Sequence, residues 1–360
     1  MKFPGDQKHW RTIVVGGGQA GLATARELGE LGEKVIVLDA STRIGDTWRN
    51  RWESLCLFTP AQHDGLPGLP FPAARDAMPS KNEMATYLEG YATHFKIPVC
   101  SGCSVESLTR NESRYTLTTT HGEFIADNVV VATGTNPRPR IPEFADQLSA
   151  SIHQLHSSHY ISADKIPRGK VLVVGAGTSG VEIALELSFT HQVFISGKTS
   201  PHIPDFLLKY AGELYWQFIS RVLTIDTPIG RKVQQKILTG GAPLIGTSAV
   251  DLEAANIERV GRVVGVQDAR PFLEDNRTLD VTSIIWATGY RPDYSWIDVE
   301  LENHFGWPFA PRGICVSAPG LYFVGMPFQY GLTSGLVGGV GRDATYISRH
   351  IHHRTLPRAS

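Results

Sequence analysis

The chain has 360 residues, of which 42% are hydrophobic, and its 34 Lys and Arg nearly balance its 35 Asp and Glu. This length and composition predict two packed domains, and the near-neutral charge argues against a nucleic-acid partner. The N-terminus lacks the apolar core of a signal peptide, and no apolar run is long enough to cross a bilayer, so we expect a cytoplasmic protein without a membrane span.

The first forty residues have the pattern of a β-α-β unit, with strands expected at 12–16 and 34–39 and a helix at 20–31. Between the first strand and the helix stands Gly16-x-Gly18-x-x-Gly21. In this motif the glycines permit a tight turn, approach of a pyrophosphate to the backbone N–H groups, and close helix packing. Asp39 ends the second strand and can accept the hydroxyls of an adenosine ribose. The unit therefore predicts a dinucleotide site at Gly16, Gly18, Gly21 and Asp39.

The next hundred residues change character twice. Residues 44–71 are irregular and rich in aromatic residues and proline, and 81–95 have helical spacing. Three segments rich in β-branched residues then predict antiparallel strands, at 105–110, 114–120 and 123–134. The proline-rich segment "TNPRPRIPEF" cannot continue a helix or strand, so we expect the chain to leave the first domain near 135–145.

A second β-α-β unit follows at 170–196, with the cradle Gly175-x-Gly177-x-x-Gly180. We count Ser179, which lies inside this cradle, among its binding residues. In place of an acid, the second strand of this unit ends in Ser196 and is followed by Lys198. A hydroxyl and an ammonium group suit a 2′-phosphate that a carboxylate would repel, so the pattern favours NADPH over NADH.

The rest of the chain predicts two helices, at 203–222 and 231–239, which we expect to cap the second domain. Residues 282–293 then repeat the design of 128–139: an apolar strand, Ala-Thr-Gly and a proline. The chain should cross back there. The predicted fold is α/β, with two Rossmann-like dinucleotide-binding domains: an FAD-binding domain of 1–140 and 290–360, and an inserted NAD(P)H-binding domain of 141–289. Two dinucleotides imply that a nicotinamide passes hydride to a flavin.

Several further motifs give the chain a resemblance to a known family. Together with the two cradles, they resemble the flavin-containing monooxygenases and their bacterial flavoprotein relatives, which are class B flavoprotein monooxygenases; the motifs are "GDTWRNRWESLCLFTP" at 45–60, "ATG" at 132–134, "HSSHY" at 156–160, "ATGYRPD" at 287–293 and "GLTSGLVGGVGRDATYI" at 331–347. The resemblance implies that NADPH reduces FAD and that the flavin forms a peroxide with dioxygen. This peroxide oxygenates a small organic substrate: a soft nucleophile (a sulfide or an amine) or a ketone.

The resemblance also assigns residues to the flavin. It implies that Trp48 lies along the flavin ring and that Gln329 and Thr333 contact its pyrimidine edge. Thr333 is expected near the start of a glycine-rich helix, whose positive end would stabilise the reduced flavin. No catalytic acid–base pair is assigned, because this chemistry resides in the flavin.

The sequence departs from the family pattern in three features. The motif F-x-G-x-x-x-H keeps His156, but Ala150 and Ile152 replace its Phe and Gly. Phe58 stands where better-studied members carry an asparagine beside the flavin peroxide, and a phenyl ring cannot hydrogen-bond that peroxide. The arginine usual for the 2′-phosphate is absent around 196–199, so NADH could be accepted as well.

These departures keep alternatives open. An NAD(P)H oxidase that releases hydrogen peroxide would suit Phe58, whereas Cys100 and Cys103, in "CSGC", invite comparison with a flavin disulfide reductase. A non-enzymatic flavin sensor would have little need for the second cradle. We expect no metal site, since no second CxxC or CxxH completes four ligands.

Overall fold

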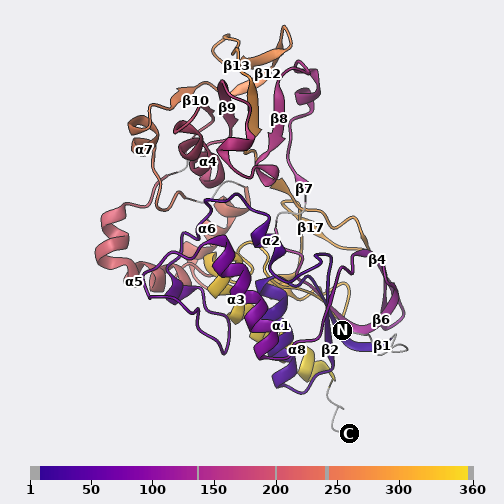
Figure 1. The fold of residues 1–360 in the computed structure, drawn as a ribbon. Helices are drawn as coiled ribbons and strands as arrows, with labels where there is room; N and C mark the ends of the chain where they lie inside the picture. The colour runs from indigo at the N-terminus through magenta and orange to yellow at the C-terminus, as the bar shows by residue number, and fades with distance from the viewer. Residues whose placement is uncertain (1–8, 136–137, 199–200, 240–242, 356–360) are drawn as a thin grey trace.

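The structure is a computed structural model that describes residues 9–135, 138–198, 201–239 and 243–355. Figure 1 shows two units joined near β7, with β1, β2, α1, α3 and α8 in the lower unit and β8, β9, β10 and α4 in the upper one. Within the described residues, no helix combines the length and apolar character needed to cross a membrane.

The lower unit is built on an eight-stranded sheet of order β16-β4-β5-β6-β1-β2-β3, with β19 pairing with β6. Strands β6, β1, β2 and β3 run parallel, and β4, β5 and β6 form an antiparallel meander. The strands are β1 (His9–Val15), β2 (Val35–Asp39), β3 (Val99–Ser101), β4 (Val105–Asn111), β5 (Arg114–Thr119), β6 (Gly122–Val131), β16 (Ile297–Asp298) and β19 (Leu321–Phe323).

Alternation along β1 divides the core of this unit into two layers. Val14 points into a cluster with α1 (Gln19–Glu30), α3 (Lys81–His94) and α8 (Val340–Thr355). Ile13 and Val15 point to the other face, where they pack against residues of the β4–β6 meander. The predicted strand, helix and meander are thus confirmed to within a few residues at their ends.

The upper unit contains a five-stranded parallel sheet of order β11-β10-β9-β14-β8. Helix α4 (Thr178–Ser188) connects β9 to β10, as the second β-α-β pattern predicts. The strands are β8 (His153–His156), β9 (Lys170–Val174), β10 (Gln192–Ser196), β11 (Glu258–Val260) and β14 (Ser283–Trp286). The sequence analysis did not predict three further features. In the upper unit these are a hairpin of β12 (Val263–Gln267) and β13 (Arg270–Leu273) and the short helix α7 (Ala249–Ala254). In the lower unit it is a small hairpin of β17 (Asn303–His304) and β18 (Trp307–Pro308).

The two chain crossings between the units lie side by side. β7 (Arg138–Pro139) pairs antiparallel with β15 (Tyr290–Arg291). His156 accepts a hydrogen bond at Nδ1 from the backbone N–H of Ser158, so its Nε2 donates to Gly289 O at 3.0 Å. Burial lowers the pKa of His156, which keeps the ring neutral for this role. The second sheet is thus inserted into the first unit, and the predicted fold class is confirmed.

Helices α5 (Asp205–Arg221) and α6 (Pro228–Thr239) form as predicted, but their place is different. We expected them to cap the second domain. Instead, Trp216, Ile219 and Leu223 form a cluster with Phe328 of the lower unit. Backbone hydrogen bonds also join the residues after α5 to the C-terminal segment, including Leu332 N to Leu223 O at 2.9 Å. One face of each helix therefore packs against the segment around 328–336, which the sequence assigned to the flavin, whereas Tyr210, Leu214 and Phe218 of α5 stay exposed.

The start of the C-terminal helix also differs from the expectation. Thr333 lies in a 3₁₀ turn, Leu332–Gly335, followed by a second 3₁₀ turn, Val337–Gly339, and α8 begins only at Val340. Three glycines, Gly335, Gly338 and Gly339, separate Thr333 from the helix. Glycine is a weak helix former because it loses much backbone freedom on ordering, which accounts for the late start. Thr333 is therefore not in the first turn of α8.

Candidate active site

The first glycine cradle combines two tightly packed glycines with one open glycine. A Cβ at Gly16 would lie 2.4 Å from Ala132 O, and one at Gly21 would lie 1.8 Å from Gly16 O. Gly16 also has φ 109°, in the region that favours glycine. By contrast, a Cβ at Gly18, the N-cap of α1, would meet nothing within 4 Å. Space is thus left for a ligand phosphate where the backbone N–H groups of the helix begin.

The second cradle has the same construction. A Cβ at Gly175 would lie 2.2 Å from Ala287 O, one at Gly180 would lie 1.8 Å from Gly175 O, and the space at Gly177 is open. Gly177 is the N-cap of α4, and Ser179 lies half-buried in the first turn of that helix. Because the two cradles repeat the same geometry, the structure fits a dinucleotide at each.

The strand ends beside the two cradles differ. Asp39, at the end of β2, is buried, and its carboxylate accepts hydrogen bonds from the backbone N–H groups of Gly17 and Ser41. Each carboxylate oxygen still has an acceptor site left, since an ionised carboxyl offers about four. The arrangement therefore holds Asp39 rigidly and leaves it able to accept ribose hydroxyls.

Ser196, the equivalent residue of the second unit, is used differently from our expectation. Its side chain is buried, its Oγ donates to Gly261 O at 2.9 Å, and it accepts from Val263 N at 3.1 Å. These bonds tie β10 to the turn between β11 and β12. The hydroxyl is therefore occupied inside the protein, whereas Lys198 is exposed two residues further on.

Trp48 lies on α2 (Asp46–Arg49), a short helix held close to α3. A Cβ at Gly45, the N-cap of α2, would lie 2.7 Å from Ala85 O, and Gly45 has φ 85°. Lys81 Nζ donates to Arg49 O at 2.9 Å and so fixes the end of α2. Trp48 itself is half-buried against the core, which leaves part of its ring accessible.

Gln329 is turned into the protein. Its Nε2 donates to Phe323 O at 3.0 Å, and its side chain is only 6% exposed. Phe328, just before it, has φ 49°, a conformation uncommon outside glycine that often marks functional segments. The side-chain amide of Gln329 thus braces this loop, and the predicted contact of Gln329 with the flavin stays a prediction.

Two features near these segments were missed by the sequence analysis. Asp64 is fully buried; its Oδ1 accepts from Thr59 Oγ1 at 2.5 Å, and its Oδ2 has no hydrogen-bond partner among the described residues. Burial raises its pKa to about 7. Tyr330 lies between two guanidinium groups, with the Cζ atoms of Arg312 and Arg342 4.0 and 4.1 Å from its ring centroid. No local pattern in the sequence indicates either feature.

Phe58 borders a cavity of 420 Å³ between the two units. Its lower-unit wall includes Trp52, Leu57 and Met78, and its upper-unit wall includes Glu182 and Leu185 of α4. Glu182 follows the cradle by about one helical turn, or about 6 Å along the helix axis. Burial raises the pKa of Glu182 to about 7. The cavity therefore joins the segment assigned to the flavin to the helix that begins at the second cradle.

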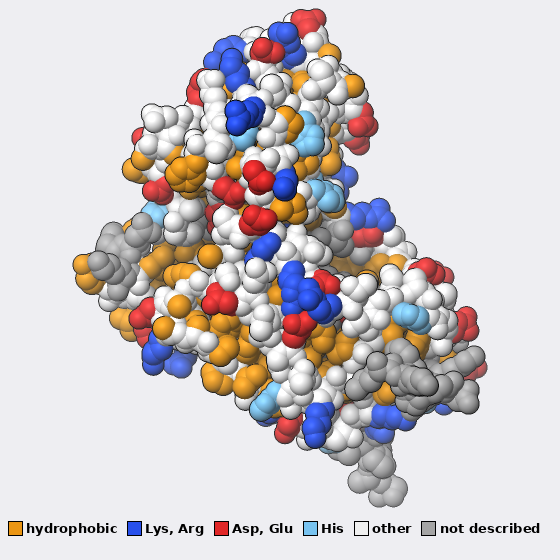
Figure 2. Space-filling model, viewed as in Figure 1, with side chains coloured by type: hydrophobic (Ala, Val, Ile, Leu, Met, Phe, Trp, Pro, Cys, Tyr) orange, Lys and Arg blue, Asp and Glu red, His pale blue; other side chains and the backbone are white. Residues whose placement is uncertain are grey.

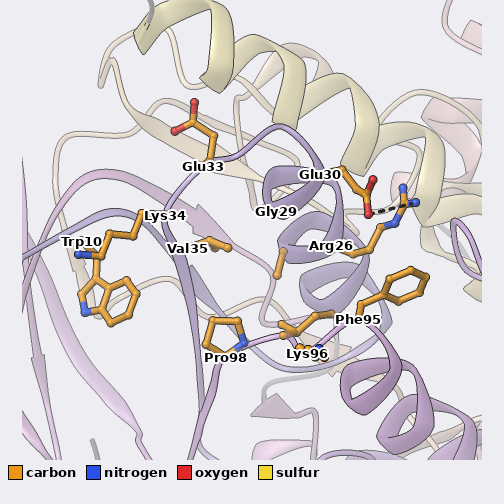
Figure 3. A pocket seen from close by; sticks show the side chains of 12 residues that line it. Trp10, Arg26, Gly29, Glu30, Glu33, Lys34, Val35, Phe95, Lys96 and Pro98 are labelled. Carbon is orange, nitrogen blue, oxygen red and sulfur yellow. Dashed lines mark ion pairs between the residues drawn. The ribbon is translucent and has the colours of Figure 1, made fainter. Parts of the chain in front are cut away.

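A second cavity of the same volume lies at the opposite end of the first sheet (Figure 3). Trp10 and Lys34 lie on one side of it, and Arg26, Glu30 and Phe95 lie on the other, with an ion pair of 3.7 Å between Arg26 and Glu30. This end of the sheet is remote from the cradle, since α/β sheets bind ligands at the carboxyl ends of their strands. We assign it no part in the reaction.

Cys100 and Cys103 lie beside Asp39, because Cys103 N donates to Asp39 O at 2.8 Å. Burial raises the pKa of Cys100 to about 12, so its thiol is protonated at neutral pH. The structure brings His121 to this pair, a third donor that the search for a second CxxC or CxxH did not consider. The pair therefore lies by the predicted adenosine end of the first dinucleotide.

Comparison with known proteins agrees with this architecture. Residues 13–202 match the family model described as pyridine nucleotide-disulphide oxidoreductase. An uncharacterized CzcO-like oxidoreductase from Geobacillus kaustophilus is 37% identical over 94% of this chain and 97% of its own length. The indole-3-pyruvate monooxygenase YUCCA1 of Oryza sativa is 30% identical over 94% of this chain and 91% of its own length.

Solved structures share the fold. A flavin monooxygenase mutant from Stenotrophomonas maltophilia superposes with a TM-score of 0.79 at 23% identity, covering 97% of this chain and all of that one. A bacillithiol disulfide reductase from Staphylococcus aureus has the same coverage with a TM-score of 0.73 at 16% identity. The chain therefore belongs to the pyridine nucleotide-disulphide oxidoreductases and, among them, to the flavin-containing monooxygenases, flavoproteins whose two dinucleotides are FAD and NADPH.

Proposed function

We propose that this FAD-dependent monooxygenase uses NADPH and dioxygen to oxygenate a small organic substrate, either a soft nucleophile such as a sulfide or an amine, or a ketone. The observation that carries this proposal is the cavity between the units. Phe58 on one wall belongs to the segment assigned to the flavin, and Glu182 on the other lies one turn from the second cradle. A substrate there would lie between the two dinucleotides.

Different residues of the chain would bind the two dinucleotides. Gly16, Gly18 and Gly21 with Asp39 would hold FAD, and Gly175, Gly177 and Gly180 with Ser179 and Lys198 would hold NADPH. Bound FAD supplies hydride acceptance and oxygen activation. Trp48 and Thr333, from α2 and the turn before α8, would border the flavin. On this assignment the domain of 141–289 is the NADPH domain, although α5 and α6 within it cover the FAD side.

The cavity walls favour a small, mostly apolar guest. Trp52, Leu57, Phe58 and Met78 supply apolar surface. Glu182 and Glu186 supply two carboxyl groups, of which that of Glu186 already accepts a hydrogen bond from Tyr160 Oη at 2.9 Å. With its pKa raised to about 7 by burial, Glu182 is largely protonated below neutral pH and can then donate a hydrogen bond to a neutral substrate. Above that pH it can accept one from an amine or pair with its cation.

Product analysis tests the proposal. The FAD-loaded protein is given NADPH, isotopically labelled dioxygen and, in turn, an aryl sulfide, a tertiary amine and a cyclic ketone. We expect NADPH-dependent incorporation of one labelled oxygen atom into one of these classes. Hydrogen peroxide as the only oxygen product with every class would instead identify an NAD(P)H oxidase. This is the second candidate, because Phe58 borders the cavity with a phenyl ring that cannot form a hydrogen bond.

A pair of variants tests the cavity itself. Met78 and Val264 are each 49% exposed, but only Met78 lines the cavity. Met78→Trp should fill the space, raise KM for the substrate and lower product yield, while reduction of FAD by NADPH without substrate is unchanged. Val264→Trp should change neither. Equal product kinetics in both variants would place the substrate elsewhere.

The disulfide-reductase alternative receives less support. A thiol that exchanges with disulfides needs a lowered pKa, and the pKa of Cys100 is raised. The likeness to bacillithiol disulfide reductase concerns the fold alone. We therefore do not assign Cys100 and Cys103 to electron transfer.

A further inference from the structure

Three side chains that carry metal-binding atoms meet at the edge of the first sheet, beside the strand end that carries Asp39. Cys100 lies in β3, Cys103 lies in the turn after β3, and His121 lies in the turn between β5 and β6. Their two sulfur atoms and one ring nitrogen all lie within 4.8 Å of one another. Cys100 Sγ is 3.9 Å from His121 Nδ1.

These separations suit donors that share one small cation. With metal–sulfur bonds of about 2.3 Å and metal–nitrogen bonds of about 2.0 Å, tetrahedral zinc places a sulfur and a nitrogen ligand about 3.5 Å apart. The observed 3.9 Å needs an adjustment of only a few tenths of an ångström. Two thiolates and an imidazole are also the ligands that zinc takes most often in proteins.

Hydrogen bonds hold the two ligand-bearing turns together without a metal. Ser104 N donates to Thr120 Oγ1 at 3.1 Å, and Thr120 N donates to Ser104 O at 3.0 Å. The turn that carries His121 is further fixed because Thr119 Oγ1 donates to Gly122 O at 2.7 Å. Little backbone ordering is therefore left for metal binding to accomplish.

The surroundings favour a metal over a redox disulfide. Cys100 and Cys103 are each 1% exposed, so an attacking thiol has little access to them. No helix begins at this CxxC, because β4 follows it, and the pair lacks the helix N-terminus that activates redox thiols. His121, by contrast, is exposed and leaves a path for a metal ion from solvent.

We propose that Cys100, Cys103 and His121 bind one zinc ion, with a water molecule as the fourth ligand. Both thiols release their protons to solvent when the ion binds. The ion joins the edge of the parallel sheet to the β5–β6 turn. Because Gly102 N donates to Ser41 O and Cys103 N donates to Asp39 O, each at 2.8 Å, the zinc would also brace the strand end predicted to bind the FAD ribose.

Metal titration of the reduced, FAD-loaded protein tests this site. After treatment with a chelator, the protein is titrated with zinc in competition with a chromogenic chelator, and bound zinc is measured by mass spectrometry. We expect one zinc per chain. His121→Ala should weaken binding by about 100-fold or more, since even residues behind the ligands contribute about 10- to 100-fold. Cys103→Ser should weaken it at least as much.

Matched controls separate the site from general effects. Cys315 is buried like the proposed ligands, and His159 is another histidine, so Cys315→Ser and His159→Ala should bind zinc as wild type does. Cobalt in place of zinc should give sulfur-to-metal charge transfer and visible bands of a tetrahedral ion, at longer wavelength than the flavin bands. Since His121 is exposed, metal-free His121→Ala should keep the FAD content and melting temperature of metal-free wild type, even if the cysteine variants do not fold.

Several outcomes would overturn the proposal. The first is that wild type fails to retain zinc in competition with the chelator. The second is that wild type and His121→Ala bind zinc with equal affinity. A third is a Cys100–Cys103 disulfide, found by peptide mass spectrometry after air exposure, that forms equally fast with and without zinc. None of these outcomes bears on the proposed monooxygenase reaction, which product analysis tests separately.

Discussion

The hydroxyl of Ser196 donates a hydrogen bond to the backbone oxygen of Gly261, 65 positions further along the chain, at 2.9 Å. Together with the bond from Val263 N, this uses the side chain that the sequence offered to NADPH. Ser196→Ala should therefore lower the free energy of unfolding by about 1–3 kcal/mol, because two polar groups of the backbone lose their partner. The ratio of kcat/KM for NADPH to that for NADH should not change. Denaturant unfolding and steady-state kinetics check the two parts, and a large change in the cofactor ratio would show that Ser196 contacts the phosphate.

Lys198 should carry the preference for NADPH that Ser196 does not. Lys198→Ala should raise KM for NADPH about tenfold or more and leave KM for NADH nearly unchanged, as expected for a lost hydrogen bond to a charged group. Lys165, which is exposed on the same unit, provides the control Lys165→Ala. Parallel increases for both cofactors in Lys198→Ala would place the 2′-phosphate elsewhere.

Two glycines of the first cradle should respond differently to a side chain. Gly18→Val should fold but lose FAD, because its Cβ meets no protein atom and would fill the space left for phosphate. Gly21→Val should instead fail to fold stably, because its Cβ would lie 1.8 Å from Gly16 O. Circular dichroism and the flavin-to-protein absorbance ratio check both. Wild-type flavin content in Gly18→Val is the result that contradicts the cradle assignment.

Phe58 should govern how much NADPH is spent without product. Phe58→Asn introduces hydrogen-bonding groups into the proposed oxygenation cavity and should raise the ratio of oxygenated product to NADPH consumed. Phe58→Leu keeps an apolar wall and should give no such gain. The ratio is measured together with hydrogen peroxide. If wild type already couples NADPH tightly to product, Phe58 has been given the wrong role.

Asp64 should make stability depend on pH. Burial raises its pKa from the usual 3.8 to about 7, so the folded state holds the proton more tightly than the unfolded state. The free energy of unfolding should therefore fall as pH rises from about 4 to about 7, by about 4 kcal/mol at most, and level off above. Asp64→Asn removes this titration. Denaturant unfolding with excess FAD measures the free energy of unfolding of both proteins. The difference between Asp64→Asn and wild type should grow as pH rises over that range. A constant difference would mean that Asp64 is ionised throughout.

Local pattern was sufficient for the parts of this protein that are built from neighbouring residues. Each cradle lies within one strand–turn–helix segment, where glycine positions and apolar periodicity have direct structural consequences. The two β-α-β units, the meander and the insertion of one dinucleotide domain into the other were predicted on this basis. The sequence also showed that the second strand of the first β-α-β unit ends in Asp39, whereas the second strand of the other unit ends in Ser196 and is followed by Lys198.

Tertiary structure decided which distant groups meet. Hydrogen bonds from β11–β12 to β10 occupy Ser196, and packing beside Phe328 places α5 and α6 against the lower unit. His121 comes within 3.9 Å of Cys100 where the β5–β6 turn hydrogen-bonds to Ser104. Such pairs lie far apart along the chain and have no shared period, so only the free energy of packing and hydrogen bonding in the folded state brings them together.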